Sequence, residues 1–265
     1  MDLKQGGVSD AGKAVKAFRD LGIGAPAFIA RVFLRRFNAW RTNRAIANAA
    51  NAQDLARAFS LIYRARWWDA GGESASGPGS TLAFTTRFRA DFESFLKERQ
   101  VSTLFDAPCG DWNWMKEIRP PASMRYIGGD VVPQLAAKLC DRYENALRRF
   151  VVFDITRDPF PDADLWLCRD CLAHLSNADI RQALSNFSRS KIPFALISNY
   201  IGDAPNEDIV SGGFRPLDLT QPPFSMPKGD FAINDWPDEE GVRQVCLWSR
   251  VQISAAMALI SETVS

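Results

Sequence analysis

Between residues 81 and 253 the sequence alternates helical patterns with short apolar runs. The runs are rich in β-branched and aromatic side chains, which is typical of buried strands. Five of them predict strands over 101–106, 126–132, 150–155, 164–170 and 194–200, and a last run over 244–253 predicts an edge strand. Strands that alternate with helices along a chain indicate a parallel sheet covered by helices. We therefore expect an α/β domain.

The segments between these runs carry the signals that start helices. Residues 81–99 predict one helix, and Pro133 suits the first turn of another, where its missing amide hydrogen costs nothing. Ser176 is expected to be the N-cap of a third, because Asp179 follows three positions later. The stretch 206–237 is rich in proline, glycine and aspartate, so we expect loops there.

Residues 1–68 follow a different pattern, which we interpret as an N-terminal helical extension to a domain at 69–265. Apolar positions recur at helical spacing between residues 27 and 37, and they are interleaved with Arg31, Arg35, Arg36, Arg41 and Arg44. Such a helix can lie on a membrane surface or a nucleic acid, or it can cover a neighbouring domain with its polar side in water. A contact between two copies of the chain through these helices is a further alternative.

Composition and charge restrict the class of protein. The 46% hydrophobic content is typical of a globular chain, and the net charge of +1 gives no overall attraction to nucleic acid. Five cysteines are few and odd in number, so we expect reduced thiols. No run approaches the roughly 18 to 20 apolar residues that span a bilayer, and the first residues do not resemble a secretory signal. A cytoplasmic protein is expected.

Three of the predicted strands close on an aspartate: Asp106, Asp130 and Asp154. In an open α/β sheet, ligands bind beyond the carboxyl ends of the strands. A carboxylate about twenty residues beyond a glycine-containing first turn can accept hydrogen bonds from both hydroxyls of a ribose. The spacing therefore predicts a ligand that contains a nucleoside.

The charge of the first turn indicates which nucleoside. Gly110 is its single glycine, and Asp106 and Asp111 flank it. A dinucleotide brings a pyrophosphate, which binds glycine-rich turns and is repelled by carboxylates. S-adenosylmethionine carries an ammonium and a sulfonium and no phosphate, so acidic side chains favour it. This pattern makes a nicotinamide-dependent oxidoreductase the weaker alternative.

These residues resemble the class I S-adenosylmethionine-dependent methyltransferases over about residues 82–251. The run Asp106-Ala-Pro-Cys-Gly-Asp111 is similar to the first motif in a subset of that family, although Pro108 and Trp112 stand where many members have glycine. The resemblance implies a Rossmann-like, mostly parallel seven-stranded sheet with helices on both faces. It also implies that Asp106, Cys109 and Gly110 line the methionine end of the cofactor, that Asp130 holds the ribose, and that Val131, Asp154 and Ile155 contact the adenine.

A narrower resemblance is to a little-described branch of the family. The segments that carry it are Ser76-Gly-Pro-Gly-Ser80, Cys109-Gly-Asp-Trp-Asn-Trp-Met115 and Cys168-Arg169-Asp170 followed by His174. The loop ending at Ser80, together with Arg87, offers hydroxyl, amide and guanidinium donors to the cofactor carboxylate; the alternative is a flexible linker. Asp111 completes the expected cofactor set.

The end of the fourth strand is where the transferred methyl group is expected. His174 is the only histidine, and an imidazole can take the proton from an acceptor hydroxyl. Asp170 is the alternative base, and Arg169 is expected to orient cofactor or substrate. Cys168 and Cys171 have no second pair of ligands to complete a zinc site, so no metal is expected.

Beyond the fifth strand, the chain offers polar groups for an acceptor. Arg215 suits a carboxylate or phosphate, and Asn206 with Asp208 suits sugar hydroxyls. We expect a methyltransferase acting on an oxygen or nitrogen of a small-molecule or glycan-like acceptor. The alternative from another class is a non-catalytic Rossmann-like binding protein.

Overall fold

The computed structural model describes residues 39, 41–202, 205–236 and 242–264, and the chain divides into two compact units, Met1–Ala45 and Ile46–Ser265. In the first unit, the described residues 39 and 41–45 are helical. The predictions for Arg31, Arg35 and Arg36 lie outside the described residues. The second unit contains the sheet and begins at Ile46, so residues 46–68 are part of it and do not form a separate extension.

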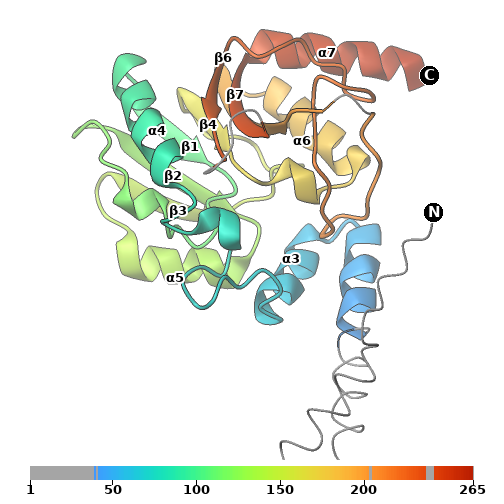
Figure 1. The fold of residues 1–265 in the computed structure, drawn as a ribbon, viewed down its shortest axis with the longest axis horizontal. Helices are drawn as coiled ribbons and strands as arrows, with labels where there is room; N and C mark the ends of the chain where they lie inside the picture. Colours follow the sequence, from blue (N-terminus) through green and yellow to red (C-terminus); the bar gives the residue numbers. More distant parts are fainter. Residues whose placement is uncertain (1–38, 40, 203–204, 237–241, 265) are drawn as a thin grey trace, which may run out of the picture. The chain divides into compact units, whose positions relative to one another are not determined.

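The second unit is built on one seven-stranded sheet (Figure 1), with strand order β3-β2-β1-β4-β5-β7-β6. The first five strands are parallel, and β7 runs antiparallel to both β5 and β6. The carboxyl ends of the parallel strands therefore meet at one edge. The strands are β1 (Thr103–Asp106), β2 (Arg125–Asp130), β3 (Arg148–Val152), β4 (Leu165–Cys168), β5 (Phe194–Tyr200), β6 (Phe231–Asn234) and β7 (Arg243–Ser249).

Five α-helices with complete boundaries connect and cover these strands: α3 (Leu55–Arg64), α4 (Thr86–Glu98), α5 (Pro133–Tyr143), α6 (Asn177–Ser188) and α7 (Arg250–Val264). Pro133 occupies the first turn of α5 as expected. The Ser176 side chain accepts a hydrogen bond from the amide of Asp179, which confirms the predicted cap of α6. Within the described residues, no helix is long and apolar enough to cross a membrane.

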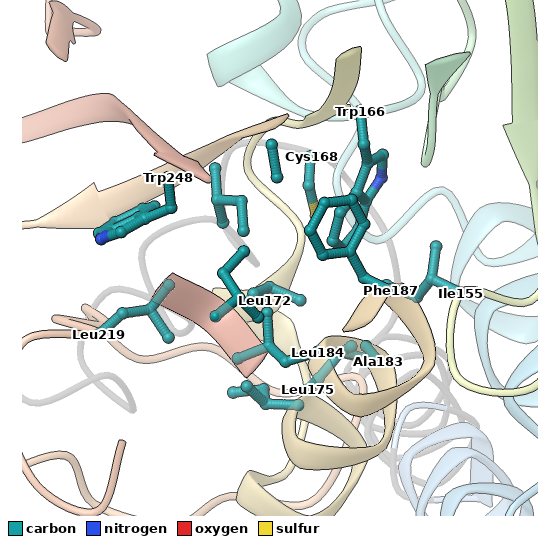
Figure 2. Packing of buried hydrophobic residues seen from close by; sticks show 14 of the residues in the cluster. Ile155, Trp166, Cys168, Leu172, Leu175, Ala183, Leu184, Phe187, Leu219 and Trp248 are labelled. Atoms are coloured by element: carbon teal, nitrogen blue, oxygen red, sulfur yellow. The ribbon is translucent and has the colours of Figure 1, made fainter. Parts of the chain in front are cut away.

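Alternate residues of the central strands build two separate cores. Leu165 and Leu167 face α4 and α5, whereas Trp166 and Cys168 face α6 and α7. Figure 2 shows Trp166 and Cys168 close to Phe187 of α6. Full burial of each large apolar side chain contributes about 1.5–3 kcal/mol, so helices on both faces hold the sheet and its carboxyl edge in place.

Two predicted strands differ from the structure. The third strand ends at Val152, so Asp154 lies in the turn beyond it and not at the strand end. The run 244–253 is not an edge strand, because β7 pairs on both sides and the chain becomes helical at Arg250. The edge strand is β6, which lies in the stretch where we expected loops.

Candidate functional site

The turn after β1 returns the chain over the carboxyl edge of the sheet. Asp106 is the last residue of β1, and Gly110 has a φ of 56°. A Cβ atom at Gly110 would lie 2.6 Å from the Oγ of Ser76. Glycine is thus required by the left-handed backbone and by the close approach of the loop at residues 74–80.

Asp106 and Asp130, the last residues of β1 and β2, place two carboxylates at this edge, with exposed fractions of 2% and 3%. The Tyr126 hydroxyl donates to Asp106 (2.6 Å), and the amides of Gly110 and Val132 donate to Asp130 (3.1 and 2.9 Å). Burial raises the pKa of Asp106 to about 7 and the pKa of Asp130 to about 6.

The charge of this carboxylate pair is only partly balanced, because burial raises the pKa of Asp106 more than the Tyr126 hydrogen bond and the nearby charge of Arg169 lower it. Among the described residues, no cationic side chain forms an ion pair with either carboxylate. An ionised carboxylate at either position is therefore costly, and a cation bound beside it would lower that cost. The pair favours a positively charged ligand.

The loop at residues 74–80 is fixed against the first turn. The Asp111 carboxylate accepts from the Ser74 hydroxyl (2.9 Å) and the Ala75 amide (2.7 Å), and the Asp111 amide donates to the Ser76 Oγ (2.9 Å). At the other end, Arg169 donates to the carbonyl of Gly79 (2.8 Å). The loop is thus a built part of the site, and the flexible-linker alternative does not hold.

Beyond β4, the buried Arg169, Asp235 and Arg243 and the half-buried Asp170 form a balanced network. Arg169 pairs with Asp235 (2.7 Å), which also pairs with Arg243 (3.0 Å), and Arg243 pairs with Asp170 (2.7 Å). Burial alone would raise the pKa of Asp170, but the charges of Arg243, His174 and Arg169 lower it below its ordinary value. Asp170 is therefore a weak base.

His174 lies at the end of the short helix Leu172–His174. Its Nδ1 lies 2.8 Å from the carbonyl oxygen of Gly213. The backbone carbonyl of His174 accepts a hydrogen bond from the amide of Gly212 (2.8 Å). Because a carbonyl can only accept, the hydrogen bond places the proton on Nδ1. In the neutral imidazole, Nε2 then keeps its lone pair and can act as a base.

These groups surround a cavity of about 720 Å³, part of which is open to solvent. The residues that line it are Phe59, Tyr63, Trp68, Ser76, Ser80, Asp106, Pro108, Cys109, Gly110, Trp114, Asp130, Val131, Arg169, Asp170, Cys171 and His174. We call it the nucleoside cavity, since the two strand-end carboxylates lie in its wall.

A second cavity, of about 610 Å³, shares Trp68, Ser76, Asp170 and His174 with the first. Its remaining residues are Gly77, Pro78, Gly79, Phe84, Tyr200, Phe214, Trp236 and Arg243. We call it the aromatic cavity. His174 therefore lies where the two cavities meet.

No family model matches the chain, and no curated protein matches it in sequence. Solved structures match the chain in fold. Human N-acetylserotonin methyltransferase in complex with SAM is 14% identical, with a TM-score of 0.51, and the match covers 72% of this chain and 58% of that one. The mitomycin 7-O-methyltransferase MmcR is 15% identical, with a TM-score of 0.51 and coverages of 77% and 60%. The chain thus spans about three fifths of each.

The chain has the Rossmann-like methyltransferase fold. The seven-stranded sheet with helices on both faces, which the resemblance implied, is confirmed. Against this fold, the nucleoside cavity brings together nine of the residues singled out from sequence: Ser80, Asp106, Cys109, Gly110, Asp130, Val131, Arg169, Asp170 and His174. Their assignment to cofactor or acceptor remains a prediction.

Four residues expected at the cofactor do not line the nucleoside cavity. Asp154 accepts from Thr156 and pairs with Arg157 (2.9 Å) in its own turn. Ile155 lies in the same buried cluster as Phe187 (Figure 2). Asp111 holds the loop at residues 74–80, and Arg87 is exposed on α4. The first two were displaced because β3 ends earlier than the sequence indicated.

The three residues expected at the acceptor line neither cavity and stabilise loops instead. Asn206 bonds the backbone of Asp218 (2.8 and 2.9 Å), and Asp208 accepts from the first amide of α6 at Asn177 (2.7 Å). Arg215 is 6% exposed and donates to Asn177 (2.8 Å) and to the carbonyls of Leu172 and Ala173. Its guanidinium therefore supports the backbone before His174 and does not clamp a substrate.

The nucleoside cavity also has lining residues from a helix that was not expected to reach it. Phe59 and Tyr63 come from α3, and the Tyr63 hydroxyl lies 2.8 Å from the Ser76 Oγ. They lie four positions apart, on one face of that helix. An aromatic pair at helical spacing just before the glycine-rich loop was the available signal.

Proposed function

We propose that the chain is an S-adenosylmethionine-dependent methyltransferase that methylates an oxygen or nitrogen of a small-molecule or glycan-like acceptor. The observation that carries the proposal is the pair of buried carboxylates, Asp106 and Asp130, without an ion-pair partner among the described residues, at the carboxyl edge of a parallel sheet. A nucleoside with cationic groups relieves this charge. A pyrophosphate would add to it.

The residues of the nucleoside cavity fit this cofactor. Each oxygen of Asp130 accepts one backbone amide and retains a second lone pair, so the carboxylate can accept two ribose hydroxyls. Asp106 would face the cationic methionine end. Arg169, the cation in the wall, is already bonded to Asp235 and Gly79, so it offers little to the phosphates of a dinucleotide.

The solved structures that share the fold support the same assignment. Both are named methyltransferases, and one was solved in complex with SAM. The cofactor, when bound, supplies a methyl group that is already activated on a sulfonium. The chain itself then has to align the acceptor and, for a hydroxyl acceptor, remove its proton.

His174 is the proposed base. Its Nδ1 is committed to the carbonyl of Gly213, and its Nε2 is free to accept a proton where the two cavities meet. Asp170 borders both cavities too, but its ion pair with Arg243 makes it the weaker candidate. A positioned base contributes about 10² to 10⁴ in rate.

A transfer assay tests this function. The full chain is incubated with methyl-labelled S-adenosylmethionine and a panel of phenols, aliphatic alcohols and amines, and we expect a labelled product from a hydroxyl acceptor. His174→Asn keeps a donor to Gly213 but has no base, so the transfer rate should fall by about 10² to 10⁴. Binding of S-adenosylhomocysteine should not change. A variant that transfers at the full rate would show that His174 is not the base.

A further inference from the structure

The aromatic cavity has a chemical character that points to one class of occupant. Resting on the function proposed above, we infer that it binds the methyl acceptor and that the acceptor is an uncharged phenol with a hydrogen-bond acceptor on its ring system. Neither the fold nor the likeness to solved structures specifies this class.

The position is that of an acceptor site. Trp68, Ser76, Asp170 and His174 line both cavities, so an occupant of the aromatic cavity borders the nucleoside cavity directly. The ring centroids of Trp68 and Phe214 lie 4.9 and 5.4 Å from that of His174. The imidazole is therefore held between two aromatic side chains, one of which, Trp68, belongs to both cavities.

The walls are made mainly of aromatic rings. Five of them line the cavity: Trp68, Phe84, Tyr200, Phe214 and Trp236. Phe84 and Trp236 meet edge to face with centroids 5.5 Å apart, and Tyr200 and Phe214 do so at 6.0 Å. Such rings favour a flat apolar occupant, because aromatic pairs gain from stacked and edge-to-face contact.

The charges of the aromatic cavity are already paired. Arg243, whose side chain is 3% exposed, forms ion pairs with Asp170 (2.7 Å) and Asp235 (3.0 Å). An anionic acceptor would have to compete with those carboxylates for the guanidinium, and a cationic acceptor would have to compete with Arg243 for Asp170. An uncharged acceptor breaks neither pair.

Tyr200 offers the occupant a polar group besides His174. Arg243 donates to the Tyr200 hydroxyl oxygen (3.2 Å), so the hydroxyl can give its own proton to an acceptor atom of the ligand. Burial raises the pKa of Tyr200, which keeps that proton in place. The Ser76 hydroxyl is bonded to Tyr63 and to the Asp111 amide. The side chains that line the cavity are thus mostly aromatic rings, which match a flat ring better than a sugar with many hydroxyls.

The proposed base matches a phenol better than an aliphatic alcohol. A phenolic hydroxyl has a pKa near 10, whereas the pKa of an unactivated aliphatic hydroxyl lies far higher, close to that of water. A neutral imidazole can share the proton of the phenol at a much smaller cost. A phenol therefore suits both the aromatic walls and His174.

Fragment binding to the full chain saturated with S-adenosylhomocysteine tests the inference. The probes are 4-hydroxyacetophenone, an uncharged phenol with a carbonyl acceptor; 4-hydroxybenzoate, its anionic counterpart; and methyl β-glucopyranoside. Ligand-detected NMR titration should give the tightest binding for 4-hydroxyacetophenone. Tyr200→Phe and Phe214→Ala should each weaken it roughly threefold to tenfold. Phe214 is 54% exposed, so its substitution should leave the fold intact.

Two matched variants serve as controls. Tyr143→Phe and Phe231→Ala make the same changes outside both cavities and should leave probe binding unchanged. Tighter binding of the benzoate or the glucoside, or equal loss in the control variants, would overturn the inference. The affinity for S-adenosylhomocysteine is measured in the same samples, because its absence would contradict the proposed function itself, whereas its presence without phenol binding would contradict only the acceptor class.

Discussion

The imidazole of His174 is oriented by one hydrogen bond whose direction is fixed by chemistry. The carbonyl of Gly213 can only accept, so the neutral ring carries its proton on Nδ1. The Nε2 lone pair then points away from that carbonyl and is free for a proton from a substrate. A largely buried network of ion pairs joins Arg169, Asp235, Arg243 and Asp170 nearby, and the imidazole is not one of its members.

This tautomer can be observed directly, because the chain has a single histidine. In an untagged protein with ¹⁵N-labelled histidine, a long-range ¹H–¹⁵N spectrum at pH 8 should show Nδ1 protonated and Nε2 unprotonated. A spectrum with the proton on Nε2 would contradict the geometry at Gly213 and leave His174 without a free lone pair toward the acceptor.

At the scale of elements, the first turn and the loop at residues 74–80 act as one unit. Asp111 bonds Ser74, Ala75 and Ser76, and Gly110 makes room for the Ser76 side chain. Each partner therefore fixes the position of the other. The cavity wall at Ser76 and Ser80 depends on this packing.

Gly110→Ala tests that coupling. The new Cβ would meet the Ser76 Oγ, and the left-handed backbone would add a cost of about 1–2 kcal/mol. We expect a lower free energy of unfolding and at least a tenfold loss of affinity for S-adenosylhomocysteine. Gly202→Ala is the control, since a Cβ atom added at Gly202 would have no neighbour within 4 Å. Equal affinities in the two variants would disprove the coupling.

The sequence identified elements well where one local signal dominates. The strand over 194–200 and the Ser176 cap have the predicted bounds, because apolar runs and capping side chains act over a few residues. The third strand was placed too late, since Phe153 and Ile155 are apolar but belong to the turn region that covers the core. Helix α7 was missed because Val251 and Ile253 continue the apolar run of β7.

The candidate site was predictable in part for the same reason. Asp106 and Asp130 are the last residues of β1 and β2, so the apolar runs that predict these strands also located the two carboxylates. The roles of Arg215 and Asn206 could not be derived, because their partners lie at least 12 positions away in the sequence. Loops of this length meet their partners only through tertiary packing.

At the scale of the whole molecule, the net charge of +1 conceals an acidic cavity. The folded-state pKa values of Asp106 and Asp130, about 7 and about 6, exceed the usual value of 3.8. Between the usual pKa of 3.8 and these raised values, the folded chain holds more protons than the unfolded chain. The stability that these groups contribute is therefore complete below about pH 4 and is lost as the pH rises through 6 and 7.

Asp106→Asn should remove most of that dependence. Urea unfolding of the ligand-free chain from pH 5 to 8 should show wild-type stability falling with pH, and the variant should be more stable at pH 8 by about 2–4 kcal/mol. Asp170→Asn is the control, because the pKa of Asp170 is lowered and its ion pair with Arg243 is stabilising. It should destabilise the chain at pH 8. If Asp106→Asn also destabilised the chain at pH 8, the unbalanced charge of Asp106 would be contradicted.

The central claim, that the acidic cavity holds a cationic and phosphate-free nucleoside, is tested most directly by calorimetric titration of the full chain at pH 8. We expect S-adenosylhomocysteine to bind with a dissociation constant on the order of micromolar, Asp130→Ala to abolish that binding while the variant remains folded, and NAD to give no heat of binding. Binding of NAD without binding of S-adenosylhomocysteine would contradict the account.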